Sequence, residues 1–186
     1  ISIDDIIDFN IKLLLKDDFL EINEEIEEIK LKIKEFILQR LRYLLIEKEY
    51  NYDVVDAVLS IKPNNVIDAF QRVEAVQNIY NLPKFNKIIT AATRTYNLSK
   101  NAKNCDINPL LFKEKEEEIL YKNYIRIRDD VKKALNKNNY NGIFDILESM
   151  TESINLFFDN VLVMEKDERI KDNRLALLKN ITNMYY

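Results

Sequence analysis

Apolar residues recur every three or four positions along almost the whole chain, the spacing that gathers side chains on one face of an α-helix. The 186 residues include one glycine, Gly142, and three prolines, so the turn residues that β-hairpins require are nearly absent. We therefore expect an all-α fold, a bundle of about eight helices without a β-sheet. The expected helices cover about residues 4–16, 22–44, 53–62, 65–80, 83–101, 114–136, 143–158 and 167–185.

Composition excludes most catalytic chemistry. The chain contains no histidine and a single cysteine, Cys105, so it lacks the commonest general base and any Cys/His couple or CxxC metal pair. One glycine rules out both a Walker-type phosphate loop and a GxGxxG turn. We expect a non-catalytic domain without a metal site, in a reducing cytoplasm, and no run of residues is apolar enough for a membrane span. Because the chain begins with isoleucine, we interpret it as a piece of a longer protein.

Two arginines interrupt apolar stripes. Arg174 shares a helical face with the other residues of its stripe, which are Ile170, Leu177, Ile181 and Met184. A buried guanidinium is tolerated only when it is paired, and Asp159 is the nearest acidic residue within apolar sequence. We therefore predict an Asp159–Arg174 pair that clamps the last two helices. Arg40 raises the same question in an earlier stripe, which comprises Ile22, Ile26, Ile29, Ile33, Phe36 and Leu44.

One segment concentrates positive charge, although the net charge of the chain is −4. Residues 84–104 include five basic residues and no acidic one. Helical geometry places Lys84, Lys87 and Arg94 on one face, opposite a face that we expect to turn towards the core (Phe85, Ile88, Ile89, Ala92 and Tyr96). Such an unopposed positive face suits RNA, although most charged helix faces are only solvated. A second basic run, residues 122–137, is interpreted as self-neutralising pairs spaced i, i+4.

Several motifs occur in the order of a known family. They are FILQRLRYLLIEKEYNYDVVDAVLS (36–60), FQRVEAVQNI (70–79), AATRTYNLSKNA (91–102), INPLLFKEKEEEILYKNY (107–124) and FFDNVLVMEKDERIKDNRLALLKNI (157–181). Together they resemble the helical, DALR-like anticodon-binding domain at the C-terminus of the β subunit of bacterial glycyl-tRNA synthetase, although Thr93 replaces a lysine of the family pattern. The resemblance covers the chain from Phe36 onward. We expect residues 1–20 to be the tail of a preceding domain or a linker, and residues 21–186 to form the anticodon-binding domain.

The resemblance implies a tRNA-binding module of glycine–tRNA ligase. Its partners would be the glycine tRNA and an α subunit that uses ATP and Mg²⁺, in a heterotetramer, and this chain itself would hold no cofactor. The alternative is a helical protein-interaction module that docks the synthetase subunits. Glycine anticodons end in two cytosines, whose edges would be read by carboxylates, amides and cationic side chains. The candidate tRNA-binding residues are Lys84, Lys87, Arg94, Lys100, Lys103 and Arg42.

Overall fold

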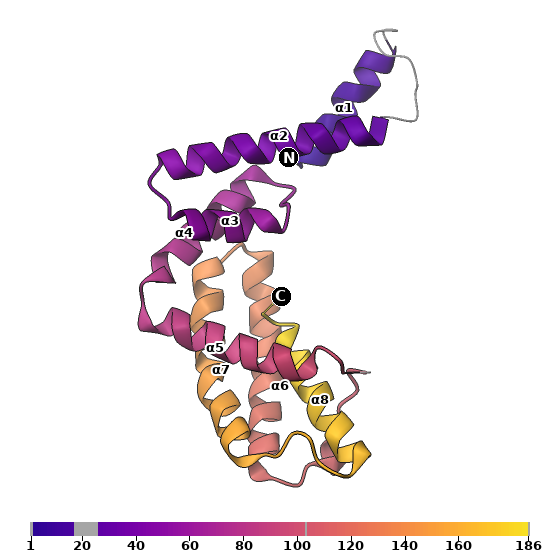
Figure 1. Cartoon of the computed structure of the whole chain (residues 1–186), viewed down its shortest axis with the longest axis vertical. Helices are drawn as coiled ribbons and strands as arrows, with labels where there is room; N and C mark the ends of the chain where they lie inside the picture. The colour runs from indigo at the N-terminus through magenta and orange to yellow at the C-terminus, as the bar shows by residue number, and fades with distance from the viewer. Residues whose placement is uncertain (1, 17–25, 103, 186) are drawn as a thin grey trace. The chain divides into compact units, whose positions relative to one another are not determined.

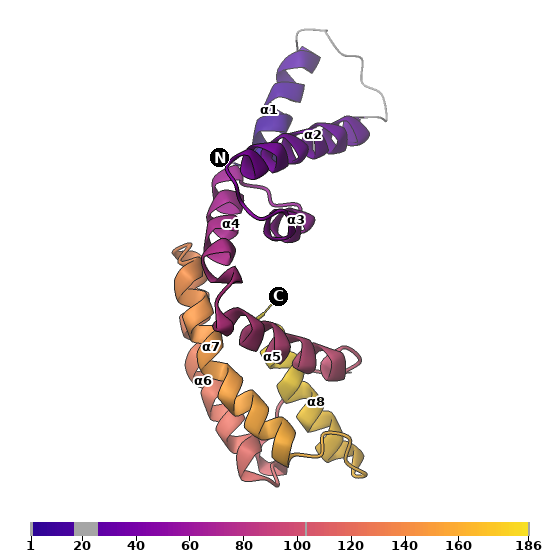
Figure 2. The same ribbon diagram turned by 60° about the vertical axis from the view of Figure 1, so that its left-hand side comes forward.

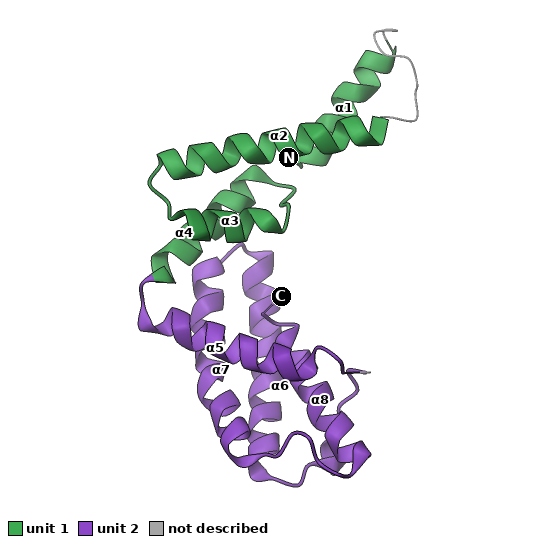
Figure 3. Cartoon of the chain, in the orientation of Figure 1, with its two compact units in different colours: residues 1–80 green, residues 81–186 purple. Residues whose placement is uncertain are grey.

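The computed structural model describes residues 2–16, 26–102 and 104–185, which are folded entirely into helices and connecting segments (Figures 1 and 2). Eight α-helices and one short 3-10 helix occur in these ranges, and no strand is found in them, so the all-α prediction is confirmed. The chain divides into two compact units, residues 1–80 and 81–186 (Figure 3). The expected division between residues 20 and 21 lies outside the described residues. No described helix has the length and apolarity needed to cross a bilayer.

The first unit comprises four helices: α1 (Ile3–Lys16), α2 (Ile26–Glu47), α3 (Tyr52–Ser60) and α4 (Val66–Tyr80). Helix α2 packs against α1 and α3, and α3 packs against α4. Asn65 caps α4, because its side chain accepts hydrogen bonds from the backbone N–H groups of Ile67 and Asp68. The cap of α3 is Asn51, which accepts from the N–H of Asp53, so the helix begins one residue before the expected start at residue 53.

The predicted inward stripe of α2 is wrong. The buried residues of this helix are Leu38, Leu41 and Leu45, which lie against α1 and α3. The predicted stripe points largely to solvent, with Phe36 62% and Leu44 53% exposed. Arg40 is exposed with it and needs no internal partner, whereas Ile22 lies outside the described residues. Two apolar stripes run along α2. Helices α1 and α3 cover the stripe of Leu38, Leu41 and Leu45, and the predicted stripe stays exposed.

The second unit comprises the remaining helices: α5 (Pro83–Ser99), the 3-10 helix η1 (Pro109–Leu111), α6 (Lys115–Asn136), α7 (Tyr140–Asn160) and α8 (Glu168–Thr182). Helices α6 and α7 lie side by side, and α5 packs on both α7 and α8 (Figure 2). Pro83 occupies the first turn of α5, which starts at the expected residue, and the side chain of Asp167 caps α8 by accepting from the N–H of Arg169.

The stripe predicted for the last helix is confirmed, and the helix before it buries an apolar stripe of its own. The buried residues of α7 include Leu147, Ile154 and Phe157, and Val161 follows them immediately after the helix. On α8, Ile170, Leu177 and Ile181 are buried together with Arg174, which is 2% exposed. Ile154, Phe157, Leu177 and Ile181 share one core cluster with residues of α6 that include Leu120 and Ile127. The apolar spacing of the last helix therefore predicted its buried face correctly, including the burial of Arg174.

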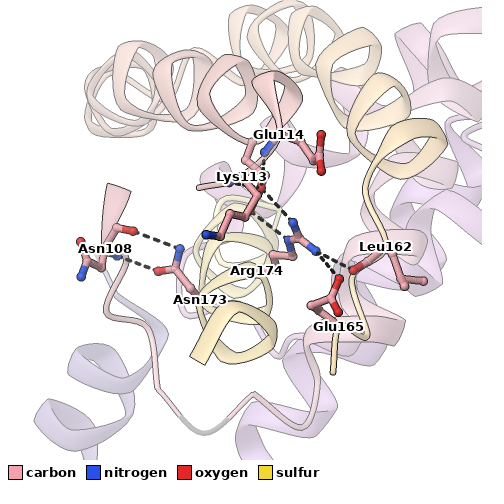
Figure 4. A network of polar contacts seen from close by, with 8 residues as sticks. Asn108, Lys113, Glu114, Leu162, Glu165, Asn173 and Arg174 are labelled. Atoms are coloured by element: carbon pink, nitrogen blue, oxygen red, sulfur yellow. Dashed lines mark hydrogen bonds and ion pairs between the residues drawn. The ribbon is translucent and has the colours of Figure 1, made fainter. Parts of the chain in front are cut away.

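Arg174 is paired, but its partner is Glu117 of α6. The guanidinium donates from Nε and Nη2 to the two carboxylate oxygens of Glu117, each over 3.0 Å. Its Nη1 donates to the carbonyl oxygen of Leu162 over 2.8 Å and lies 3.8 Å from a carboxylate oxygen of Glu165, in the segment between α7 and α8 (Figure 4). The carboxylate of Glu117 also accepts from the backbone N–H groups of Lys113 and Glu114, over 2.8 Å each. Every charged group in this buried cluster is therefore satisfied.

The predicted Asp159–Arg174 pair is wrong. The side chain of Asp159 is exposed near the end of α7, while the contacts of Arg174 run to α6 and to the segment that follows α7. A second polar contact ties α8 to the long connector after α5: the side-chain amide of Asn173 both accepts from the N–H and donates to the carbonyl of Asn108 (Figure 4). The closing motif is thus bound to segments far away in the sequence.

We expect removal of either member of the buried pair to be severe. Glu117→Gln removes the buried counter-charge of Arg174 and leaves only the more distant carboxylate of Glu165, 3.8 Å from Nη1, and such a loss costs about 3–5 kcal/mol of unfolding free energy. Urea denaturation of the purified chain measures it, with Glu118→Gln as the matched exposed control, expected to change stability by less than about 0.5 kcal/mol. The double variant Glu117→Leu/Arg174→Met should lose less unfolding free energy than the single variants Glu117→Leu and Arg174→Met lose in sum. Strictly additive losses would contradict the pairing.

The pair also predicts a pH dependence. Burial alone raises the pKa of Glu117, but hydrogen bonds from Arg174 and from the N–H groups of Glu114 and Lys113 outweigh it and hold the pKa below the ordinary value. A lowered folded-state pKa contributes stability above the unfolded value of about 4.3, and this contribution is lost as the pH falls through the folded value. The stability gap between wild type and Glu117→Gln should therefore be constant above about pH 5 and narrow in more acidic solution. A gap that is independent of pH would refute this.

Candidate nucleic-acid interface

The basic face of α5 lies against α7. Lys84 donates to Asp145 over 2.8 Å, and the Nζ of Lys87 lies 3.9 Å from a carboxylate oxygen of Glu148. The prediction that these lysines share a face with Arg94 is consistent with this, since all three reach the same neighbouring helix. The prediction of an unopposed positive field is wrong, because α7 supplies a carboxylate to each lysine. Charge on this face is balanced.

Arg94 is the best-packed cation of the face. Its Nη1 donates to the side-chain oxygen of Asn155 over 3.0 Å, and its guanidinium lies over the ring of Phe158, 4.4 Å from the centroid. Phe158 in turn meets the buried Phe157 edge to face. A guanidinium stacked on an aromatic ring is held in a fixed plane while its remaining N–H groups stay available to an acceptor. Arg94 therefore has a defined orientation beside the surface described next.

A groove of about 510 Å³ opens along this face. Its lining consists of Lys87, Glu148, Ser149, Thr151, Glu152, Asn155, Leu156 and Asp159. Glu152 and Asp159 are exposed carboxylates that form no ion pair with another described residue, and Asn155 offers an amide beside Arg94. The groove thus combines hydrogen-bond acceptors and donors with one apolar side chain, Leu156, and these acceptors and donors are the groups needed to hydrogen-bond the edges of an unstacked base.

The core-facing side of α5 was predicted only in part. Ile88 is buried, but Ile89 is 48% and Tyr96 42% exposed. The remaining buried residues are small, namely Ala91, Thr95 and Ser99. They allow α5 to approach α8 closely, and the hydroxyls of Ser99 and Thr182 share a buried hydrogen bond of 2.9 Å. The spacing of Ala91, Thr95 and Ser99 at i, i+4 indicates this contact in the sequence, although none of the three is a large apolar residue.

The other candidate residues are dispersed. Arg42 is occupied by a two-pronged contact with Asp56 of α3, over 2.6 and 3.0 Å. Lys100 is exposed at the C-terminal end of α5, and Lys103 lies outside the described residues. Along α6 the exposed charges form local pairs, Lys122 with Glu118 and Lys133 with Asp130. These are not the i, i+4 pairs expected from the sequence, which were Arg126 with Asp130 and Lys133 with Asp129, so that pairing is wrong although charges of both signs lie side by side.

Glu117 is the residue that sequence reasoning missed. It lies in the acidic run at the start of α6, which resembles a solvated face, yet it is completely buried. Its spacing from Glu114 was the available signal, because the two residues form a capping box that turns the Glu117 side chain back towards the helix N-terminus. Within the described residues, no cluster of histidine, cysteine and acidic side chains is arranged to hold a metal ion.

The sequence of the second unit matches a known protein family. Residues 88–184, which span most of α5 and all of α6, α7 and α8, match the DALR anticodon binding domain. The chain belongs to this family. The match lies within the second unit, so the groove and the buried Glu117–Arg174 pair are both features of the DALR domain of this chain.

Alignments with similar proteins cover more of the chain than the family match over residues 88–184 does. The chain is 36% identical over 190 residues to the glycine–tRNA ligase β subunit of Halothermothrix orenii, a match that covers 99% of this chain and 26% of the relative. The β subunit of Desulforudis audaxviator is 34% identical (87% of this chain, 23% of the relative), and that of Clostridioides difficile is 33% identical (92% and 25%). The chain thus spans about a quarter of the length of these curated relatives.

Proposed function

We propose that this chain is the anticodon-binding part of a glycine–tRNA ligase β subunit and that it holds the anticodon arm of a glycine tRNA. The observation that carries the proposal is the DALR match over residues 88–184, together with glycine–tRNA ligase relatives that align with nearly the entire chain. The chain would support the ATP-dependent formation of glycyl-tRNA without catalysing it. Glycine activation, with ATP and Mg²⁺, would belong to an α subunit in a cytoplasmic heterotetramer.

The groove between α5 and α7 supports a specific role in reading bases. A cytosine presents an amino donor beside two acceptors, and glycine anticodons contain two adjacent cytosines. The carboxylates of Glu152 and Asp159 would accept from the amino group, while Asn155 and Arg94 would donate to the acceptors. Uracil presents a carbonyl oxygen where cytosine has its amino group, so the same carboxylates would repel it. Balanced charge on this face therefore favours recognition of base edges over general attraction of phosphates.

The first test is binding of the chain to a fluorescent anticodon stem-loop of a glycine tRNA, measured by anisotropy at several salt concentrations. We expect affinity that falls with salt, and a preference for the native loop over one with both anticodon cytosines changed to uracil. Lys87 lies 3.9 Å from Glu148 and its side chain is 61% exposed, so it remains able to contact a phosphate, and Lys87→Gln should lower the slope of log affinity against log salt by about one. Lys132→Gln, an exposed lysine of α6, is the matched control and should leave the slope unchanged. Absence of binding even at low salt would argue against the proposal.

The reading role makes its own prediction. Asp159→Asn and Glu152→Gln preserve shape but replace an acceptor with an amide, and a lost base contact of this kind reduces discrimination by about tenfold. We expect each variant to lower the preference for cytosine over uracil while the chain still binds the stem-loop. Asp129→Asn on α6 is the control with the same change of charge. Unaltered preference in both variants would remove the groove as the reader and leave tRNA binding itself in place.

A docking function for the first unit is the second candidate. The observation that favours it is the exposed stripe of α2, where Phe36 and Tyr43 are 62% and 58% exposed. Exposed large apolar side chains gathered along one face of a helix typically mark a contact with another protein segment. The two functions are compatible, because the stripe lies in residues 1–80 and the DALR match in residues 81–186.

A further inference from the structure

The exposed stripe of α2 has the spacing of a coiled-coil seam. Its members are Ile29, Ile33, Phe36, Arg40 and Tyr43, separated by four, three, four and three residues. This alternation is that of the a and d positions, the residues that one helix presents to another. The four apolar members are all exposed, whereas Leu38, Leu41 and Leu45 bury the other side of the helix. We call these five residues the α2 seam.

Arg40 defines what the seam can bind. It is exposed in the middle of the seam, and it forms no ion pair with any residue in the described part of the chain. Its neighbour Arg42 is engaged by Asp56. A helix laid on the seam would remove Arg40 from water, and an uncompensated buried guanidinium is strongly unfavourable. A partner must therefore bring a carboxylate to this position.

Two other occupants fit the seam less well. A second copy of α2 in parallel would place Arg40 against its own equivalent, and an antiparallel copy would place it against an apolar d position (Ile29, Phe36 or Tyr43), so neither supplies a carboxylate. The bases of single-stranded RNA would stack on Phe36 and Tyr43, but Ile29 and Ile33 at the other end have no aromatic ring on which a base could stack. The aliphatic part of the seam favours a protein helix.

We propose that the α2 seam binds an amphipathic helix that carries one carboxylate opposite Arg40, and that this helix comes from the remaining three quarters of a glycine–tRNA ligase β subunit. The source rests on the proposed function and on the length of the relatives, of which this chain spans about a quarter. The apolar positions of the seam supply the area of contact, and Arg40 fixes the register. A single charged a position serves this purpose in coiled coils at a cost in stability.

The test uses fluorescent 30-residue peptides that tile the rest of the Halothermothrix orenii β subunit, with the intact 186-residue chain as receptor. We expect binding by a peptide that combines an apolar a/d pattern with a carboxylate on the same face. Arg40→Glu should weaken it at least tenfold, and exchange of the peptide carboxylate for lysine should restore binding to that variant. Lys132→Glu on α6 is the control with an equal charge change. Because the substituted side chains are exposed, circular dichroism should show no loss of helix in either variant.

Three results would overturn the proposal. The first is that no peptide binds, or that the binding peptide ignores Arg40→Glu. The second is a dimer of the chain in sedimentation that Phe36→Glu dissociates, which would assign the seam to a second copy. The third is stem-loop binding that is lost in Phe36→Ala and Tyr43→Ala, which would assign it to RNA. The first two leave stem-loop binding by the DALR domain intact, so failure of this inference is distinguishable from failure of the proposed function.

Discussion

Glu117 and Arg174 form the one ion pair in the described part of the chain whose two side chains are both buried. The pair joins the first turn of α6 to the middle of α8, and through Leu162 it also holds the segment that follows α7. Burying two charges is tolerated because each polar atom finds a partner: the carboxylate accepts four hydrogen bonds and the guanidinium is shared between α6 and this segment. Three elements of the DALR domain are thereby fixed at one point.

The groove depends on that point. Helix α7 ends at Asn160, and two residues later the backbone of Leu162 accepts from Arg174. The end of α7 is thus held where Phe158 supports Arg94 and where Asp159 reaches the groove. On the other side, the small residues of α5 set its close approach to α8 and so turn its cations towards α7. The positions of the base-reading candidates follow from packing and are not set by the groove residues themselves.

The sequence was sufficient to predict the helices and the core of α7 and α8, because each of these helices has a single apolar face. It could not identify the partner of Arg174, which lies 57 residues away and is joined to it by tertiary packing alone. On α2 two apolar stripes run along the helix, and the period alone could not say that α1 and α3 would cover the stripe of Leu38, Leu41 and Leu45. On α5 the buried face consists of small residues whose hydrophobicity is weak, so periodicity gave the wrong rotation of the helix.

Arg40 and Arg174 pose one physical problem and meet it in two different ways. Each interrupts an apolar stripe at helical spacing, and the pattern alone predicts for both a buried guanidinium that needs a carboxylate partner. In the DALR domain the chain supplies the carboxylate itself, so the stripe closes over Arg174. On α2 no described residue supplies one to Arg40, and the stripe stays open with the arginine in solvent. Because burying an unpaired guanidinium is strongly unfavourable, a helix that covers this face has to bring a carboxylate to Arg40, so the arginine restricts which partner the stripe can bind.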